Sequence, residues 1–262
     1  MPLSPEKVKE VAAALYKAER EQAPITPLTE TYPDLDVADA YAIQQEGIRL
    51  RLASGGRIIG WKVGLTSKAM QQMFNVTSPD FGHLLDTMLI EDGATVSCAG
   101  LISPRIEPEV AFQINADLRG PGVTADQVLA ATEYLIPALE LIDSRIKDWK
   151  IKLGDTVSDN ASSRGFVLGK KRTPPAGINL GLIGMNFYLN GDLVSTATSA
   201  AVLGNPAEAV AWMANTLAPY GQYLAAGQVI MPGSLVGALD AKPGAHIRAE
   251  FDHLEGVEIR FN

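Results

Sequence analysis

The segment PRIEPEVAF, residues 104–112, is an apolar strand pattern interrupted by two glutamates, Glu107 and Glu109. Residues i and i+2 of a strand project from one face, so the two carboxylates lie close together and repel each other. Because Pro108 between them has no backbone N–H, it predicts a sheet edge or a bulge at this point. The pattern fits a solvated strand face, and it also fits a site in which a cation sits between both carboxylates.

A second apolar strand pattern, IPALELID (residues 136–143), carries the carboxylate Glu140. A charge in such a run is costly to bury unless it is paired or bound to a metal. Glu140 therefore either faces solvent, pairs with a cation such as Arg145, or joins Glu107 and Glu109. Three carboxylates without a neighbouring histidine or thiolate form an oxygen-rich site, which favours Mg²⁺ or Mn²⁺ over Zn²⁺ or Cu²⁺.

Lys62 is the only charged residue between Arg57 and Lys68, in the glycine-flanked apolar strand pattern GWKVGLT. Its ammonium group either reaches solvent along the strand surface or offsets the carboxylates and holds an anionic substrate. The following GLTSK lacks the glycine spacing of a phosphate-binding loop, so the sequence predicts no nucleotide site.

The composition narrows the class of protein. The chain has 262 residues, 47% of them hydrophobic, and 30 acidic against 22 basic residues give a net charge of −8. The basic residues are dispersed, which argues against nucleic acid as a partner. No apolar run approaches the roughly 20 residues of a membrane span. The single cysteine, Cys98, allows no intrachain disulfide, so we expect a soluble protein of the reducing cytoplasm.

The pattern of elements changes near Gly55–Gly56. Residues 1–56 predict a helical cap region, with Ser4 and Asp36 as helix N-caps. Residues 57–262 predict strands and hairpins with few helices, so we expect an α+β fold: a curled mixed β-sheet with the N-terminal helices packed on it. A capping-box pattern at Thr124 predicts a helix to about Tyr134. The polar segment DTVSDNASS, residues 155–163, is typical of a solvated loop or a binding loop.

Six motifs in this order carry a family resemblance: GWKVGLTSKAMQ, SPDFGHL, PRIEPEVAF, IPALELIDSRIKDW, DTVSDNAS and GQVIMPGSL. Together they resemble the 2-hydroxypenta-2,4-dienoate (2-oxopent-4-enoate) hydratases of the fumarylacetoacetate hydrolase superfamily, from about Glu19 to Asn262. The hydratases that act on a dicarboxylic homologue and the 4-oxalocrotonate decarboxylases are similar as well. The resemblance implies a mixed β-roll as the catalytic domain at residues 57–262, activity in the breakdown of aromatic compounds, and a homo-oligomer.

The resemblance also implies roles for individual residues. Its metal ligands fall on Glu107, Glu109 and Glu140, for Mg²⁺ or Mn²⁺, and its strand lysine and acid/base aspartate fall on Lys62 and Asp80. An aspartate at position 80 favours hydration over decarboxylation. The implied substrate-binding positions are Leu65, Ser162, Arg164 and Ser234. Pro232 before Gly233–Ser234 and Ser163–Arg164 after the DNAS motif depart from the hydratase pattern, and Arg164 either reads a distal substrate carboxylate or faces solvent.

We therefore expect a hydro-lyase that adds water to 2-hydroxypenta-2,4-dienoate, or to a substituted or dicarboxylic homologue, and forms the 4-hydroxy-2-oxo acid. In this hypothesis the metal chelates the C1 carboxylate and the C2 oxygen, Lys62 offsets negative charge, and Asp80 handles protons or activates water. The alternative is a metal-dependent 4-oxalocrotonate (2-oxohex-3-enedioate) decarboxylase. A complex with the sister decarboxylase of the pathway is a further expectation.

Overall fold

The computed structural model describes residues 2–262, apart from the side chain of Met73. Its helices are α1 (Pro5–Glu21), α2 (Leu28–Thr31), α3 (Val37–Ala53), α4 (Lys68–Phe74), α5 (Ala125–Ala130), α6 (Leu153–Ser158) and α7 (Pro206–Leu217). Its strands are β1 (Ile58–Gly64), β2 (Asp80–Leu85), β3 (Leu89–Ile90), β4 (Thr95–Val96), β5 (Arg105–Ile114), β6 (Thr132–Ile142), β7 (Ser163–Leu168), β8 (Gly184–Leu189), β9 (Asp192–Thr198), β10 (Val229–Met231), β11 (Leu239–Asp240), β12 (His246–Phe251) and β13 (Glu255–Phe261).

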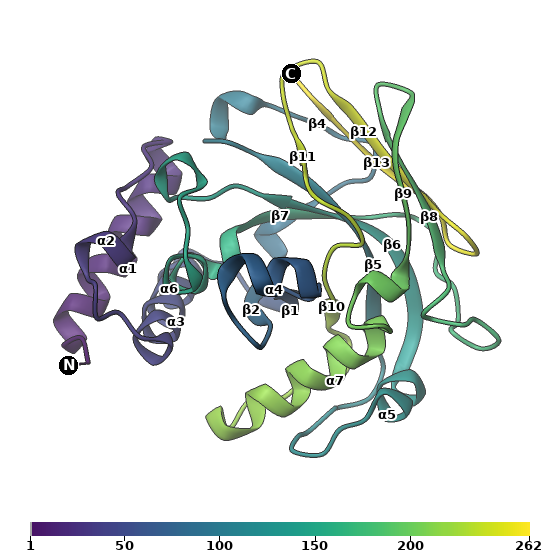
Figure 1. Ribbon diagram of the computed structural model, residues 1–262, viewed down its shortest axis with the longest axis horizontal. Helices are drawn as coiled ribbons and strands as arrows, with labels where there is room; N and C mark the ends of the chain where they lie inside the picture. Colours follow the sequence, from purple (N-terminus) through teal and green to yellow (C-terminus); the bar gives the residue numbers. More distant parts are fainter. Residues whose placement is uncertain (1) are drawn as a thin grey trace.

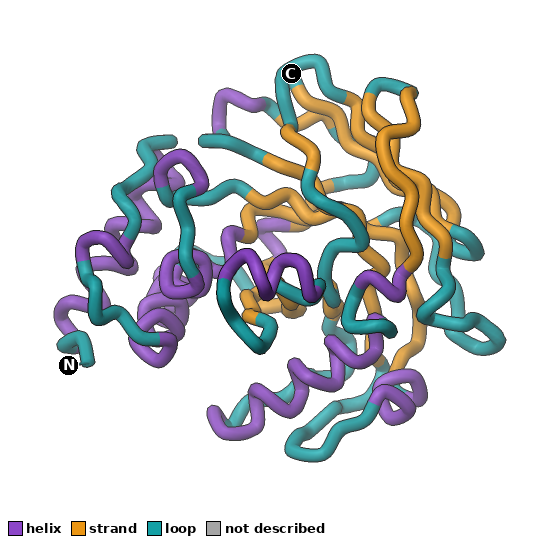
Figure 2. The backbone as a smooth tube through the Cα atoms, viewed as in Figure 1, coloured by secondary structure: helices purple, strands orange, loops and turns teal. Residues whose placement is uncertain are grey.

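The described strands form two mixed sheets (Figures 1 and 2). An eight-stranded sheet has the order β2-β1-β10-β5-β6-β7-β3, and β11 also pairs with β5. A five-stranded sheet has the order β4-β13-β12-β8-β9. Parallel pairs join β1 to β10, β3 to β7 and β4 to β13, whereas the other pairs are antiparallel. The expectation of an α+β fold on a mixed sheet is confirmed.

The strands β5 and β6 form the longest ladder of the molecule, and their two faces have different roles. One face of β5 carries Ile106, Val110 and Phe112, which lie in the main hydrophobic core together with residues of the second sheet and α7. The opposite face carries Glu107, Glu109 and Ala111, as the two-residue period of a strand requires. The apolar half of the ladder therefore fixes the register in which the polar half is presented.

The N-terminal helices lie to one side of the sheets, beside α6 (Figure 1). Ser4 accepts a hydrogen bond from the Lys7 N–H and Asp36 accepts one from the Asp39 N–H, so both predicted N-caps are confirmed. Buried side chains of α1, α2 and α3 pack together with Ile146 in a cluster of their own. Among the described helices, none is long and apolar enough to cross a membrane.

Two hairpins that the sequence predicted are present. Asn190 and Gly191, with φ values of 54° and 92°, form the turn between β8 and β9, and β12 pairs with β13 along its whole length. The capping box at Thr124 is also present, but its helix ends at Ala130 rather than near Tyr134. The next residues enter β6 instead, because pairing of Thr132 to Ile142 with β5 outweighs the local helix pattern.

The close approach of β1 to β10 gives a test of this architecture. A Cβ atom at Gly60 would lie 2.0 Å from the Val229 carbonyl oxygen, which is backbone of the neighbouring strand. Gly60→Ala should therefore lower the free energy of unfolding by at least about 2 kcal/mol, measured by urea denaturation. Gly47→Ala is the control: Gly47 lies inside α3 with no atom near its Cβ position, so this change should raise stability by about 0.5–1 kcal/mol. Equal stabilities of the two variants would contradict the pairing of β1 with β10.

Candidate metal centre and active site

Two neighbouring strands bring three glutamates together. In the β5–β6 ladder Glu107 lies directly opposite Glu140, and Glu109 lies opposite Ala138. Directly opposed residues of an antiparallel pair project from the same face, so all three carboxylates meet there. Each of them offers an oxygen atom within 4.8 Å of the others'. Glu109 and Glu140 are fully buried and Glu107 is half-buried, so the expectation that Glu107 and Glu109 share a face with Glu140 is confirmed.

Pro108 does not interrupt the ladder between β5 and β6, where it pairs with Leu139 without a register shift. Its carbonyl oxygen accepts a hydrogen bond from the Leu235 N–H, so the polar groups of Pro108 point away from β6. On that side β5 pairs with β10 at Phe112 and with β11 at Ile106, and Pro108 lies in the gap between them. The expected bulge is wrong, but the proline does lie at an unpaired edge, which is filled by the segment 232–238.

Several buried carboxylate oxygens of this cluster lack hydrogen bonds. Glu109 Oε2 accepts one from the Gly233 N–H at 2.7 Å, whereas Glu109 Oε1 and Glu140 Oε1 have no partner among the described residues, and Glu140 Oε2 has only an ion pair with Lys62. Unpartnered buried anionic oxygens are strongly unfavourable. A hard divalent cation is the partner that three carboxylates suit best, so the donor set fits Mg²⁺ or Mn²⁺.

Lys62 on β1 is buried beside this cluster. Its Nζ atom lies 3.2 Å from Glu140 Oε2 and donates a hydrogen bond to the Ala161 carbonyl oxygen at 3.2 Å. Burial lowers the pKa of Lys62, but the surrounding carboxylates, above all Glu140 and Asp80, outweigh burial and hold this pKa above its ordinary value. Lys62 therefore does not reach solvent, and Glu140 pairs with Lys62 rather than with Arg145.

Asp80 begins β2 directly opposite Gly64 of β1, and only 2% of its surface is exposed. A Cβ at Gly64 would lie 2.2 Å from Asp80 Oδ1, so the absence of a side chain at Gly64 makes room for this carboxyl group. Burial raises the pKa of Asp80, and the nearby Lys62 opposes that rise only in part. Asp80 Oδ1 has no hydrogen-bond partner among the described residues, so one oxygen remains free to act on a ligand.

The pKa values of the glutamates are raised as well. Burial, and next the charge of Glu140, raise the pKa of Glu107 to about 7, and the same two causes raise that of Glu109 well above its ordinary value. Without a metal, the folded protein therefore binds more protons than the unfolded chain between about pH 4.5 and 7. In that window these groups make the free energy of unfolding fall as the pH rises.

The polar segment 155–163 is buried rather than solvated, and its first part belongs to α6. Asn160, Ala161 and Ser162 have φ values of 53°, 51° and 56°. Each left-handed residue costs roughly 1–2 kcal/mol, and such strain often marks functional segments. This turn directs the Ala161 carbonyl oxygen at Lys62 and leaves Ser162 Oγ buried with no hydrogen-bond partner in the described structure.

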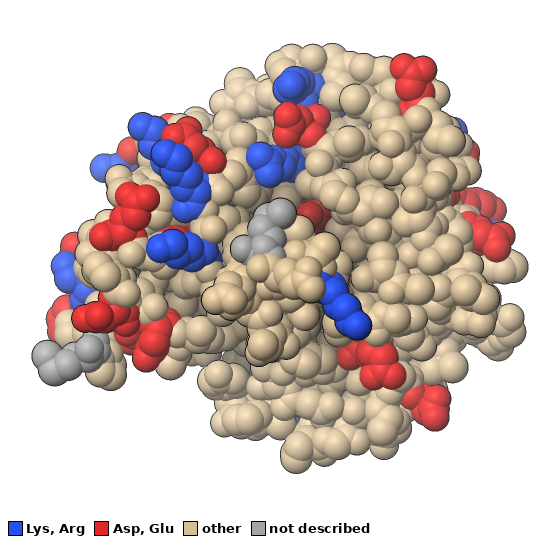
Figure 3. Space-filling view, in the orientation of Figure 1, with Lys and Arg blue, Asp and Glu red and all other residues tan. Residues whose placement is uncertain are grey.

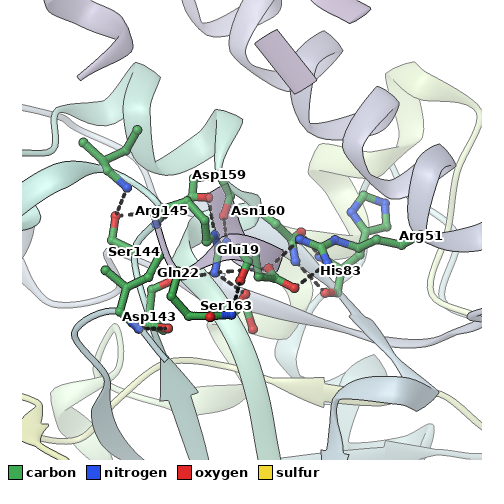
Figure 4. A network of polar contacts seen from close by, with 12 residues as sticks. Glu19, Gln22, Arg51, His83, Asp143, Ser144, Arg145, Asp159, Asn160 and Ser163 are labelled. Atoms are coloured by element: carbon green, nitrogen blue, oxygen red, sulfur yellow. Dashed lines mark hydrogen bonds and ion pairs between the residues drawn. The ribbon is translucent and has the colours of Figure 1, made fainter. Parts of the chain in front are cut away.

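Arg145 holds this left-handed turn through hydrogen bonds and an ion pair (Figure 4). Its guanidinium group donates to the carbonyl oxygens of Asp143, Asp159 and Ser163 and forms an ion pair with the Asp159 carboxylate. The Asn160 side chain exchanges two hydrogen bonds with the His83 backbone of β2, at 2.8 and 3.0 Å. Arg145 thereby fixes Asp159 and Ser163 on either side of the turn, and the His83 backbone fixes Asn160, its first residue.

A cavity of about 530 Å³ opens next to these groups. Lys62, Asp80 and Glu107 line its polar end, and Glu109 and Glu140 lie buried behind it. Of the expected substrate-binding residues, the structure brings three to the cavity wall: Leu65, Ser162 and Ser234. It does not bring Arg164 there, since Arg164 lies near the Glu19 carboxylate and helps to lower the pKa of that group.

Arg105 and Trp149 also line the cavity, although neither was predicted as a site residue from the sequence. Arg105 shares a face with Glu107 by strand periodicity, so its place was available from the sequence. Trp149 lies in the loop after β6, and the sequence does not indicate the direction that this loop takes.

The family model described as fumarylacetoacetate (FAA) hydrolase C-terminal matches residues 62–261. The chain belongs to the fumarylacetoacetate hydrolase family. Within this family it is 49% identical to a 2-hydroxyhexa-2,4-dienoate hydratase of Comamonas testosteroni, over 94% of each chain. It is 41% identical to a 2-keto-4-pentenoate hydratase of Paraburkholderia xenovorans (strain LB400), over 99% of this chain and 96% of that protein. Among solved structures, a 4-oxalocrotonate decarboxylase from Pseudomonas putida G7, complexed with magnesium and adipate, matches 99% of both chains with 37% identity and a TM-score of 0.97.

The raised pKa of Glu107 gives a test of the metal centre. A divalent cation competes with protons for the carboxylates, so the affinity for Mg²⁺ should fall as the pH drops below about 7, approaching about tenfold per pH unit for each carboxyl group that must lose a proton. Isothermal titration calorimetry at pH 6, 7 and 8 measures this dependence. Glu107→Gln should weaken binding at pH 8, whereas Glu133→Gln, at an exposed position of β6, should not. An affinity that is constant from pH 6 to pH 8 would contradict the site.

Proposed function

We propose that this protein is a metal-dependent hydro-lyase that adds water to 2-hydroxypenta-2,4-dienoate, or to a substituted homologue, and yields the 4-hydroxy-2-oxo acid. One observation carries the proposal: a buried carboxyl group with a raised pKa, Asp80, faces the same cavity as the Glu107 end of the carboxylate cluster. The names of the two hydratase relatives support the reaction class. Such hydratases belong to the degradation of aromatic compounds.

The metal ligands in this proposal are Glu107, Glu109 and Glu140. A bound Mg²⁺ or Mn²⁺ would supply Lewis-acid stabilisation of the negative charge that develops on the substrate's 2-oxygen. The magnesium named with the Pseudomonas putida G7 decarboxylase supports this choice of ion. Lys62 compensates the negative charge that three carboxylates leave beside a dication, and thereby admits an anionic substrate.

Asp80 is the acid and base of the reaction in this proposal. Because burial raises the pKa of Asp80, its carboxyl group can give a proton to C5 of the dienol while the 2-hydroxyl proton passes to solvent, which produces the conjugated 2-oxo-3-enoate. The resulting Asp80 carboxylate can then take a proton from the water that adds at C4, while C3 takes a proton from solvent, so that Asp80 ends protonated as it began. Lys62 stands close enough to favour the anionic form of Asp80 between the two transfers.

The test is the loss of the ultraviolet absorbance of 2-hydroxypenta-2,4-dienoate with protein and Mg²⁺. Asp80→Asn should lower kcat by about 10²–10⁴-fold and leave the Mg²⁺ affinity within a few-fold of the unchanged protein. Glu109→Gln should lower both turnover and Mg²⁺ affinity, because Glu109 is a proposed ligand. A rate at background level, or a rate that a chelator does not change, would contradict a metal-dependent hydratase.

The second candidate is a decarboxylase of 2-oxohex-3-enedioate, and the high structural similarity to a 4-oxalocrotonate decarboxylase favours it. Release of CO₂ from this diacid, compared with hydration of the monoacid under the same conditions, separates the two activities. We expect hydration to be the faster reaction. Asp80 is a group that can activate water, and decarboxylation does not require one. Faster CO₂ release would assign the decarboxylase.

A further inference from the structure

Arg105 lies at the cavity and takes no part in the chemistry proposed above. It is the first residue of β5 and shares a face of that strand with Glu107 and Glu109. It precedes Glu107 by two residues, which corresponds to roughly 6.5 Å along a strand. Arg105 and Glu107 therefore line the same cavity from two positions of one strand face.

The side chain of Arg105 is held in place by the ring of Trp149. Its guanidinium carbon lies 4.5 Å from the centre of the Trp149 ring, a cation–π distance. The indole N–H of Trp149 donates to the Ser103 carbonyl oxygen at 2.9 Å. Asp148 and Trp149 have φ values of 59° and 54°, a strained conformation that presents the ring to Arg105. Two left-handed residues in succession indicate that the placement of Trp149 is functional.

The charge of Arg105 is incompletely neutralised. Asp240 Oδ1 lies 3.4 Å from Arg105 Nε, but the Asp240 side chain is 59% exposed, and an exposed pair of this kind contributes little. Arg105 Nε is buried and donates no hydrogen bond within the described structure. Nε faces Asp240 and is closed to a ligand, so a ligand would meet the charge and the terminal N–H groups of the guanidinium.

The other positive side chain among the described residues that line the cavity, Lys62, is already committed to Glu140 and the Ala161 carbonyl oxygen. Figure 3 shows positive side chains gathered over the N-terminal helices, with fewer on the rest of this face. The wall that α4 contributes to the cavity includes the apolar residues Ala69, Met70 and Phe74. A second anionic group on a ligand would therefore find its partner at Arg105.

We propose that Arg105 determines specificity at the far end of the substrate, where it binds the second carboxylate of a dicarboxylic 2-hydroxy-dienoate or 2-oxo-enoate. This assignment rests on the proposed function, which places the first carboxylate at the three glutamates. A six-carbon diacid has five carbon–carbon bonds of about 1.5 Å each between its carboxylate carbons, a span comparable to the roughly 6.5 Å between the backbone positions of Arg105 and Glu107. The planar guanidinium group can bind a carboxylate through two parallel hydrogen bonds.

Two unreactive acids of equal length, hexanedioate and hexanoate, test this role, since they differ only in the far carboxylate. With Mg²⁺ at saturation, isothermal titration calorimetry should show that hexanedioate binds at least about tenfold more tightly than hexanoate. Arg105→Met should remove this preference and leave hexanoate binding unchanged. Arg105→Lys should retain part of it, because charge remains but the planar fork is lost. Asp240→Asn should strengthen hexanedioate binding about two- to threefold, because a competing carboxylate is removed.

Arg119→Met is the matched control. Arg119 also stacks on an aromatic ring, that of Tyr223, and pairs with an aspartate, Asp117, but it does not line the cavity. This variant should keep the full preference for hexanedioate. Equal binding of the two acids by the unchanged protein, or a preference that survives in Arg105→Met, would overturn the proposal. Because the probes do not react, either result is independent of whether 2-hydroxypenta-2,4-dienoate is hydrated.

Discussion

The repulsion among three buried carboxylates is the constraint on which the rest of the structure depends. Glu107 and Glu140 are directly opposed across the β5–β6 ladder, and Glu109 is one strand period away. Like charges in that arrangement are destabilising, and burial strengthens the effect. Lys62 offsets part of the charge from the adjoining β1–β10 side of the sheet, and burial together with the charge of Glu140 still keeps the pKa values of Glu107 and Glu109 raised. The cluster therefore favours the binding of a cation.

The ladder tolerates this repulsion because its opposite face is a hydrophobic core. Ile106, Val110 and Phe112 are fully buried there, and their partners on β6 face the same core. Next to the glutamates, Ala111 and Ala138 are small and pack with Ile48 of α3. The packing energy of one face, which grows with the buried apolar area, therefore holds the unfavourable charges of the other face in place.

How much the sequence could predict depended on whether the signal was local. The two-residue period placed Glu107 and Glu109 on one face, and a lone charge in an apolar run marked Glu140, because burial of an unpaired charge is penalised wherever the chain goes. The burial of residues 155–163 was not predicted, because a polar segment becomes buried only when partners outside it satisfy its backbone groups, as Arg145 does for the carbonyl oxygens of Asp159 and Ser163. Arg164 was expected at the substrate, but it does not line the cavity. Whether a residue of a strand faces a cavity depends on the register of that strand, and the sequence motif does not encode the register.

The left-handed turn at residues 160–162 links parts of the chain that differ widely in sequence position. Arg145, which clamps the turn, also lies 3.8 Å from Glu19 of α1, and Gln44 of α3 donates to the carbonyl oxygens of Phe81 and Val157 at 2.9 and 2.8 Å. Strain in the turn is thus balanced by contacts that the N-terminal helices supply. Fraying of those helices would release the turn, and with it the carbonyl group that orients Lys62. The order of these peripheral helices therefore bears on the precision of the chemistry at the centre.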